Sequence, residues 1–166
     1  MSQRTGSAIL GRVEQRLADA GLRLPEVVAP LAAYVPAQRD GRHVYTSGQL
    51  PMVDGSMVLT GKVGEGIGLV SPADAKRLAA TCALNALAAV KGVIGDLDVV
   101  ERVVKVVGFV AADPSFGGVP GVVNGASELL ETAFGDAGRH ARSAVGVAVL
   151  PLDACVEVEI VVAVHD

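Results

Sequence analysis

An arginine near the C-terminal end of the chain is the side chain best placed to bind a small anion. Arg142 begins a segment rich in valine, and in a strand alternate residues point to the same face. Arg142 therefore heads a row of very small residues, which are Ala144, Gly146 and Ala148. Such a row forms either a close packing contact or the floor of a pocket. A guanidinium can hold a carboxylate through two parallel hydrogen bonds, and the alternative role for Arg142 is a surface salt bridge.

Two glutamates follow in the last predicted strand. Glu157 and Glu159 alternate with Val156, Val158 and Ile160, so both carboxylates project from one face. Like charges so close together need water or cationic partners. The commoner arrangement for such a pair is a solvated or salt-bridged strand face.

Other familiar catalytic patterns are absent from the sequence. There is no GxSxG or HExxH motif, and His43, His140 and His165 are isolated, which predicts surface or loop positions for all three rather than metal ligation. The glycines of segment 64–68 lack the preceding strand and the full spacing of a dinucleotide-binding loop. The sequence gives no reason to expect a metal or a nucleotide cofactor.

The elements that must position these side chains are predicted from hydrophobic spacing and from capping residues. The expected order is helix, strand, strand, helix, strand, helix, strand, strand, as one layer of helices on a mixed sheet. Ser71-Pro72 should start the second helix and Gly95 end it, and Pro120 and Gly135 should bound the third. The expected ranges are helices 9–20, 71–95 and 120–135, strands 42–49, 57–59, 99–110, 142–150 and 155–164, an irregular lead-in 24–36 and a surface loop 61–68. The strand 99–110 should be central and covered on both faces.

The last two strands are expected to pair as a hairpin through residues 151–154. This register places Arg142 opposite Val162, about 17 Å along the sheet from Glu157. Direct cooperation between the arginine and the glutamate would then require a second subunit.

Composition limits the classes of function. The 166 residues suit one domain, and 51% of them are hydrophobic although only 3% are aromatic, so small and branched aliphatic side chains must fill the core. With 14 basic and 18 acidic residues and no charged run, nucleic acid is a poor partner. Positive mean hydropathy favours an oligomer that hides apolar surface.

The sequence also predicts where the protein works. Cys82 and Cys155 lie far apart without a CxxC spacing, which argues against a disulfide and fits a reducing cytoplasm. We find no leader peptide pattern and no apolar run that approaches the length of a membrane span. A cytoplasmic protein that binds no membrane is therefore expected.

Three segments resemble the signature stretches of the RidA/YjgF family. They are Tyr45-Thr46-Ser47-Gly48-Gln49-Leu50-Pro51, His140-Ala141-Arg142-Ser143-Ala144-Val145 and the stretch from Leu150 to Glu159 that ends in Val-Glu-Val-Glu. The resemblance spans residues 34–164. It implies a RidA-like domain over residues 34–166 preceded by an extra helix and lead-in over residues 1–33, typical of a longer subgroup.

The resemblance implies a chorismate-mutase-like α+β fold of the Bacillus type, with two main helices on one face of a mixed sheet. It also implies a homotrimer whose ligand clefts lie between neighbouring subunits. Well-known members of the family hydrolyse reactive enamines and imines such as 2-aminoacrylate to 2-keto acids and ammonia, without metal or cofactor. A small carboxylate is therefore the expected ligand.

Matching the family's motifs to this chain gives Arg142 as the clamp for the substrate carboxylate and Glu157 as the group that activates water. The other residues that match the family's site are Tyr34, Ser47, Gly48 and Asn124. Many members have a cysteine where this chain has Ala144. That difference leaves open a second hypothesis, a non-catalytic protein that binds or senses a small carboxylate in the same cleft. Ribonuclease activity is attributed to some relatives, but the acidic charge balance argues against it here.

Overall fold

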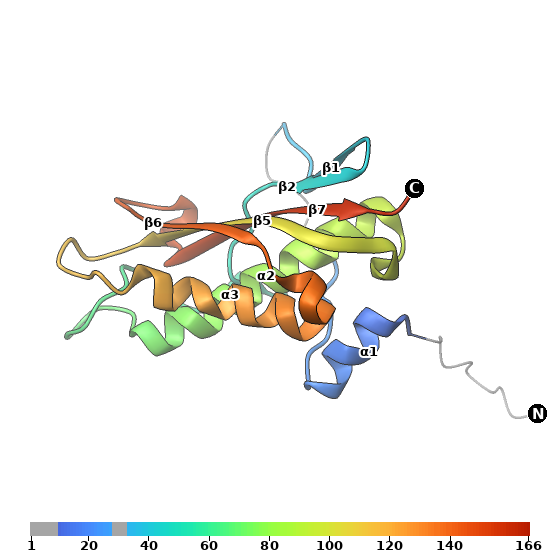
Figure 1. Ribbon diagram of the computed structural model, residues 1–166. Coiled ribbons are helices and arrows are strands. Elements are labelled where there is room, and N and C mark those ends of the chain that lie inside the picture. The colour runs from blue at the N-terminus through green and yellow to red at the C-terminus, as the bar shows by residue number, and fades with distance from the viewer. Residues whose placement is uncertain (1–9, 28–32) are drawn as a thin grey trace, which may run out of the picture.

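A five-stranded mixed sheet carries Arg142 and Glu157, and its strands come from both halves of the chain (Figure 1). The computed structural model describes residues 10–27 and 33–166. The strand order is β1-β2-β7-β5-β6, and only the β5–β6 pair is parallel. The bounds are β1 Ala37–Asp40, β2 His43–Thr46, β5 Val100–Ala111, β6 Ala141–Val147 and β7 Val156–Val164.

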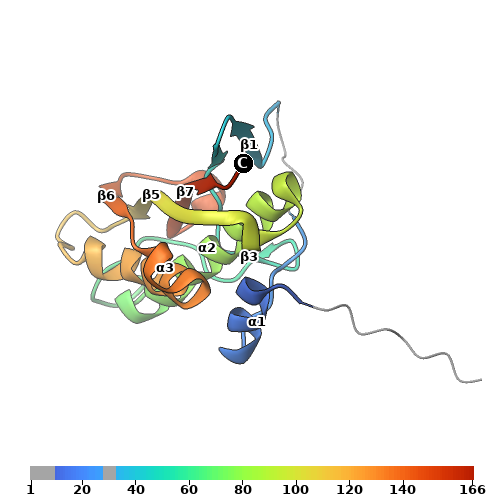
Figure 2. The same cartoon turned by 45° about the vertical axis from the view of Figure 1, so that its right-hand side comes forward.

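Two long helices cover one face of this sheet. The helices α2 (Pro72–Ile94) and α3 (Val119–Phe134) lie side by side beneath it, while none of the helices in residues 10–27 and 33–166 covers its other face (Figures 1 and 2). The predicted caps of α2 are confirmed, because the Ser71 side chain accepts a hydrogen bond from the Asp74 amide and Gly95 ends the helix with a positive φ. Pro120 lies in the first turn of α3, and Gly135 follows its last residue.

The two helices approach each other closely at one glycine. A Cβ atom placed on Gly125 of α3 would lie 1.8 Å from the carbonyl oxygen of Lys76 in α2. Because that oxygen belongs to the backbone, a larger residue at position 125 would force the helices apart. Gly125 therefore sets the distance between the helices on which the position of α3 depends.

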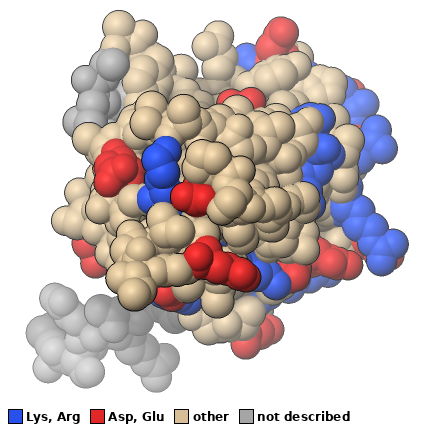
Figure 3. All heavy atoms as spheres, turned by 90° about the vertical axis from the view of Figure 1, so that its left-hand side faces the viewer, with Lys and Arg blue, Asp and Glu red and all other residues tan. Residues whose placement is uncertain are grey.

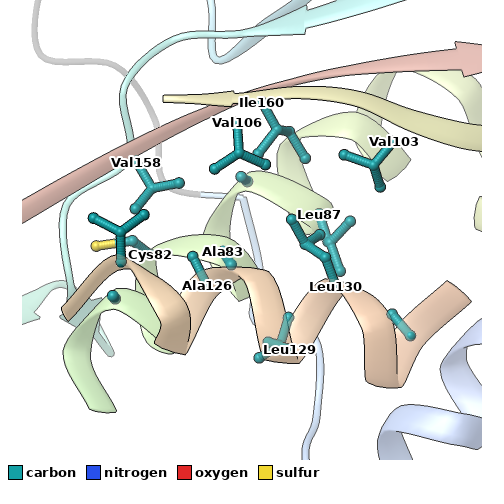
Figure 4. Packing of buried hydrophobic residues seen from close by; sticks show 14 of the residues in the cluster. Cys82, Ala83, Leu87, Val103, Val106, Ala126, Leu129, Leu130, Val158 and Ile160 are labelled. Atoms are coloured by element: carbon teal, nitrogen blue, oxygen red, sulfur yellow. The ribbon is translucent and has the colours of Figure 1, made fainter. Parts of the chain in front are cut away.

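Small and branched aliphatic side chains fill the core between the helices and the sheet, as the composition predicts. Figure 4 shows Leu87 of α2 and Leu130 of α3 lying close to Val106 and Ile160 of the sheet. The residues labelled there are buried; they are Cys82, Ala83, Leu87, Val103, Val106, Ala126, Leu129, Leu130, Val158 and Ile160. Dense packing of this kind fixes each strand relative to the helices.

The expectation that no apolar run approaches the length of a membrane span is wrong for α2. By length and composition this 23-residue helix is apolar enough to cross a membrane. More than half of its most apolar stretch is buried inside the fold. Burial against the sheet and α3 accounts for this apolar composition, as it does for the core helix of any compact domain.

The predicted hairpin of the last two strands is also wrong. β6 and β7 lie on opposite edges of β5 and do not pair with each other. Arg142 is the register partner of Val106 in a parallel pair, and Val106 is in turn the partner of Ile160 of β7. The physical reason is that β5, α3 and β6 form a crossover unit, in which a helix connects two parallel neighbouring strands. β7 is then left to pair with the other edge of β5.

Three smaller differences concern the sheet and the first hairpins. The segment before Gly41 forms β1, a strand that lies between the expected lead-in 24–36 and the expected strand 42–49 and was not predicted. The short strand expected at 57–59 is β4 (Ser56–Met57), and it pairs with β3 (Met52–Val53) across the expected turn at Asp54-Gly55. β5 is an interior strand as predicted, but only one of its faces is covered, since Val107 and Phe109 on the other face are half-buried in the single chain.

A tertiary cap holds the N-terminal helix, α1 (Arg12–Asp19), against the rest of the chain. The Asp98 carboxylate, in the short 3-10 helix η1 (Leu97–Val99), accepts hydrogen bonds from the backbone N–H groups of Arg12 (2.8 Å) and Val13 (2.9 Å). Val13 and Leu17 are buried as expected, whereas Leu10 is exposed and Ile9 lies outside the described residues. Burial opposes ionisation of Asp98, but these hydrogen bonds and the Arg12 side chain outweigh it and hold the pKa of Asp98 below its ordinary value.

We expect Asp98→Ala to lower the free energy of unfolding by about 1–2 kcal/mol, because two N–H groups at the start of α1 lose their acceptor. Amide hydrogen exchange at Arg12 and Val13 should speed up more than exchange in α2. The pKa of Asp98 is lowered, so this stabilisation is present above the ordinary aspartate pKa and is lost as the pH falls through the folded-state value. Asp19→Ala, which removes an exposed carboxylate at the other end of α1, is the matched control, and equal exchange rates in both variants would contradict the prediction.

Candidate functional site

Arg142 lies where β6 meets the first half of α3. Its Nη1 donates to the Asn124 Oδ1 at 2.8 Å and to the Ser127 Oγ at 3.2 Å, and its Nη2 donates to the Pro120 carbonyl at 3.4 Å. All three acceptors belong to α3 or its first turn. Two of the residues matched to the family's site, Arg142 and Asn124, therefore contact each other within one chain.

The acceptors around Arg142 are all neutral. Within residues 10–27 and 33–166, none of the ion pairs involves Arg142. Its positive charge therefore has no countercharge in direct contact from the described part of its own chain. A guanidinium held in place by neutral groups can bind a carboxylate without first giving up a salt bridge.

Two residues beside Arg142 were not predicted from sequence as part of a site. The Ser127 Oγ lies 2.9 Å from the His140 Nε2, and the His140 Nδ1 lies 2.6 Å from the Gly138 carbonyl oxygen. His140 is half-buried in the loop before β6, in agreement with the surface or loop position expected for it, and a hydrogen-bonding partner lies beside each ring nitrogen. The spacing of Asn124 and Ser127, three residues apart in a predicted helix, was the signal that could have placed Ser127 on the same face.

Arg142, Ser127 and His140 border a shallow hollow of about 300 Å³ between α3 and the start of β6. Glu128, Glu131 and Arg139 also line it, and Arg139 lies 3.7 Å from the Glu131 carboxylate. Glu128 is paired with Lys76 at 2.9 Å, and Arg139 is mostly exposed. The hollow is large enough for a small organic acid next to the guanidinium.

Glu157 lies against the loop that follows β2. A Cβ atom placed on Gly48 would lie 1.9 Å from the Glu157 Oε1, so only glycine leaves room for the carboxylate in this position. Gln49 holds the loop against β7 through two backbone hydrogen bonds with Val158, of 2.8 and 3.0 Å. Burial raises the pKa of Glu157 above its ordinary value, and the nearby Glu159 carboxylate raises it further.

Tyr34 and Ser47 lie on the other side of the same loop. The Ser47 hydroxyl donates to the Val35 carbonyl at 2.6 Å, and the Ser47 amide donates to the Pro36 carbonyl at 2.9 Å. Tyr34 is 53% exposed and lines an open hollow of about 510 Å³ together with Tyr45 and Ser47. The loop therefore brings Tyr34, Ser47, Gly48 and Glu157 into one neighbourhood.

The predicted residues thus form two separate groups in one chain. Arg142 and Asn124 lie on the helix-covered side, whereas Glu157 points to the open face of the sheet, like every second residue of β7. In the observed register Glu157 of β7 is the partner of Phe109, which lies three residues along β5 from Val106, the partner of Arg142. Because β5 lies between β6 and β7, the backbones of Arg142 and Glu157 are about 14 Å apart. The distance expected from sequence was similar, but it rested on the wrong strand pairing.

Charge on one face of the molecule does not resemble that of a nucleic-acid-binding protein. On the side of the molecule drawn in Figure 3, acidic and basic side chains both occur and most of the surface is uncharged. The formal net charge of the chain is −4. A phosphate backbone normally requires a continuous basic surface, so this face offers no such surface.

Comparison with known proteins gives one consistent result. A family model described as "YjgF/chorismate_mutase-like, putative endoribonuclease" matches residues 14–164. Protein TCP17 of Trypanosoma cruzi is 41% identical over 157 residues, which are 94% of this chain and 96% of that protein.

Solved structures agree with this result. The crystal structure of Atu1372 from Agrobacterium tumefaciens has 45% identity and a TM-score of 0.85, and 92% of each chain is covered. A protein from Shewanella oneidensis described as "a putative endoribonuclease" has 32% identity and a TM-score of 0.87, covering 93% of this chain and 100% of its own. Both alignments are long enough to show a shared fold over nearly the whole chain.

We expect Glu159→Gln to lower the pKa of Glu157, because it removes the like charge beside it. The pKa should stay above the ordinary glutamate value, since burial is the larger cause of the shift. Because its pKa is raised, Glu157 keeps its proton up to a higher pH than an ordinary glutamate does. In Glu159→Gln, Glu157 should lose its proton at a lower pH than in the wild type. A carboxyl ¹³C NMR titration measures this directly. Glu65→Gln in an exposed loop should leave the titration unchanged, and an unshifted Glu157 in the Glu159 variant would refute the coupling.

Proposed function

The chain belongs to the YjgF/chorismate mutase-like family, and from this premise we propose that it hydrolyses reactive imines and enamines of small amino acids. The products are 2-keto acids and ammonia, and neither a metal nor an organic cofactor takes part. The observation that carries the proposal is the Arg142 guanidinium, which neutral groups of α3 orient while its charge stays available. A substrate of this class carries the carboxylate that such a group binds.

Arg142 acts in this proposal as the clamp for the substrate carboxylate. Two charge-assisted hydrogen bonds fix the plane of the carboxylate and therefore the direction of the neighbouring imine carbon. Asn124 restrains the guanidinium from the helix side at 2.8 Å. Orientation is most of what this reaction needs, because an imine carbon is already electrophilic.

Glu157 acts as the base that activates water. Water adds to the imine carbon as the Glu157 carboxylate accepts one of its protons, and the substrate nitrogen takes up a proton from solvent to give a carbinolamine. Glu157 then returns its proton to the amino nitrogen, the C–N bond breaks to release ammonia, and the hydroxyl proton passes to solvent to leave the keto group. An enamine is first protonated at its terminal carbon to give the imine. The raised pKa of Glu157 suits a group that must both accept a proton and return it.

We place this site between subunits of a homotrimer. Arg142 and Glu157 lie on opposite sides of the sheet in one chain, so a substrate that meets both requires residues from two copies. The half-buried Val107 and Phe109 on the open face supply apolar surface that a neighbouring copy would cover. Tyr34, Ser47 and Gly48 would line the same cleft next to Glu157.

Ala144 supports a second candidate function. It occupies the position where many relatives have a cysteine, two residues after the clamp, and packs partly buried against the core. If chemistry depended on that thiol, the chain would bind a small carboxylate without turning it over. Ribonuclease activity, named in the family description, is disfavoured by the net negative charge.

We expect Arg142→Ala to lower kcat/KM for imine hydrolysis by about a hundredfold or more, since each charged hydrogen bond is worth roughly 1.5–3 kcal/mol. The assay follows ammonia and keto acid released from enzymatically generated 2-aminoacrylate and bulkier imines, at equal trimer content by size-exclusion chromatography. Arg142→Lys should recover only part of the activity, because lysine lacks the planar fork. Arg77→Ala, an exposed arginine of α2, is the control. Wild-type protein that binds 2-oxobutanoate but turns over none of the imines would establish the binding function instead.

Gly48→Ala should abolish most turnover while leaving the fold intact. The backbone φ of Gly48 is not in the left-handed region, so alanine is allowed there, but its Cβ would displace the Glu157 carboxylate. We expect kcat to fall more than KM rises, because water activation is affected and carboxylate binding is not. Circular dichroism and thermal unfolding check the fold, and Gly121→Ala, where a Cβ meets no atom within 4 Å, is the control. Unchanged kcat in Gly48→Ala would argue against Glu157 as the base.

A further inference from the structure

We propose that Ser127 and His140 are positioning residues that hold the Arg142 guanidinium in its binding orientation. The inference rests on the proposed function, because it concerns the residue that binds the substrate carboxylate. Neither residue would contact the substrate itself. Their role is to fix the direction of the Arg142 Nη1 through a short sequence of hydrogen bonds that ends on the backbone.

The direction of each hydrogen bond follows from donor and acceptor chemistry. The Gly138 carbonyl can only accept, so the His140 Nδ1 must carry a proton. In the neutral imidazole the Nε2 is then an acceptor, and the Ser127 hydroxyl donates to it. A serine oxygen whose proton points toward His140 presents its lone pairs elsewhere, and the Arg142 Nη1 at 3.2 Å donates to them.

The backbone at the end of this sequence is itself held firmly. Gly138 is buried, and a Cβ placed on it would lie 2.3 Å from the Leu130 carbonyl oxygen of α3. The Gly138 carbonyl therefore has little freedom to move. His140 lies immediately before β6 and Arg142 is the second residue of that strand, and both side chains contact Ser127 on the face of α3 that also carries Asn124.

The groups that hold Arg142 are uncharged, and this leaves the charge of the guanidinium available to the substrate. A carboxylate in place of Ser127 would hold Arg142 more strongly, but it would also neutralise the charge needed for the substrate. Ser127, hydrogen-bonded to His140, restrains the guanidinium and leaves its charge free. Asn124 acts in the same way from the preceding turn of α3, so two neutral acceptors fix one Nη1 nitrogen.

Two substitutions of His140 separate this role from a merely structural one. In His140→Asn the side-chain amide can still donate to the Gly138 carbonyl, in the place of Nδ1, but it leaves the Ser127 hydroxyl without its acceptor. In His140→Gln the side-chain oxygen reaches the place of Nε2 and can accept from Ser127. Ser127→Ala removes the middle of the sequence. Thr132→Ala on α3 and His165→Asn near the C-terminus are matched controls, since each removes the same kind of group away from Arg142.

We expect Ser127→Ala and His140→Asn to raise KM for the imine, and the Kd for 2-oxobutanoate, by roughly threefold to tenfold with a smaller change in kcat, as loss of one hydrogen bond would do. His140→Gln should recover most of the loss, and both controls should match the wild type. Crystal structures of the variants give a readout that needs no substrate. The guanidinium of Arg142 should leave its contact with position 127 in Ser127→Ala and His140→Asn and keep it in His140→Gln.

The possible results distinguish this inference from the proposed function. Imine turnover by the wild type, with KM and the Arg142 position unchanged in Ser127→Ala and His140→Asn, would overturn the inference and leave the function standing. Absence of turnover and of 2-oxobutanoate binding in the wild type would overturn the function. In that case the position of the Arg142 guanidinium in the crystal structures of the variants still decides whether Ser127 and His140 hold it in place. Equal losses in His140→Asn and His140→Gln would also count against the inference.

Discussion

The close packing of β5 against α3 is the constraint on which the rest of the structure depends. A Cβ on Gly108 of β5 would lie 2.5 Å from a methyl carbon of Val123, so the helix can sit this near the sheet only because that residue is glycine. α3 connects β5 to the parallel strand β6 and therefore lies beneath both. The close approach of α3 to the sheet brings Asn124 within hydrogen-bonding distance of Arg142. A helix lying farther from the sheet would leave the guanidinium to move freely or to pair with whatever acid was near.

The same arrangement explains why the two candidate groups of residues are separated. β5 uses one edge to pair with β6 and the other to pair with β7, and the strand alternation then sends Glu157 to the face that has no helix. The loop at Gly48 packs against Glu157 on that face and removes part of its water, which is the main cause of its raised pKa. Residues in the first half of the chain thus determine the surroundings of the Glu157 carboxylate, and residues in the second half determine those of the Arg142 guanidinium.

Local sequence patterns were reliable for the elements and unreliable for their pairing. Ser71 and Gly95 fixed both ends of α2 because capping depends on a few neighbouring backbone groups, and the alternation around Glu157 fixed its face because the period of a strand is local. The hairpin of β6 and β7 was wrong because nothing in residues 151–154 encodes that β5, forty residues earlier, would lie between them. β1 was missed because Gln38 and Arg39 are exposed polar residues in an edge strand, which leaves no hydrophobic alternation to detect. Ser127 and His140 were missed because their contact depends on how α3 meets the start of β6, which only the folded chain determines.

Separation of the guanidinium from the carboxylate is itself a chemical requirement of the proposed reaction. If Arg142 and Glu157 lay within contact distance in one chain, they would form an ion pair, and the Glu157 pKa would fall instead of rising. The arginine would then offer fewer donors to a substrate, and the glutamate would be a weaker base. Neutral partners for Arg142 and a partly dehydrated position for Glu157 avoid both effects. A substrate that reaches both groups at once, with its carboxylate on one and its imine carbon near the other, then supplies the charge balance that the unliganded protein leaves open.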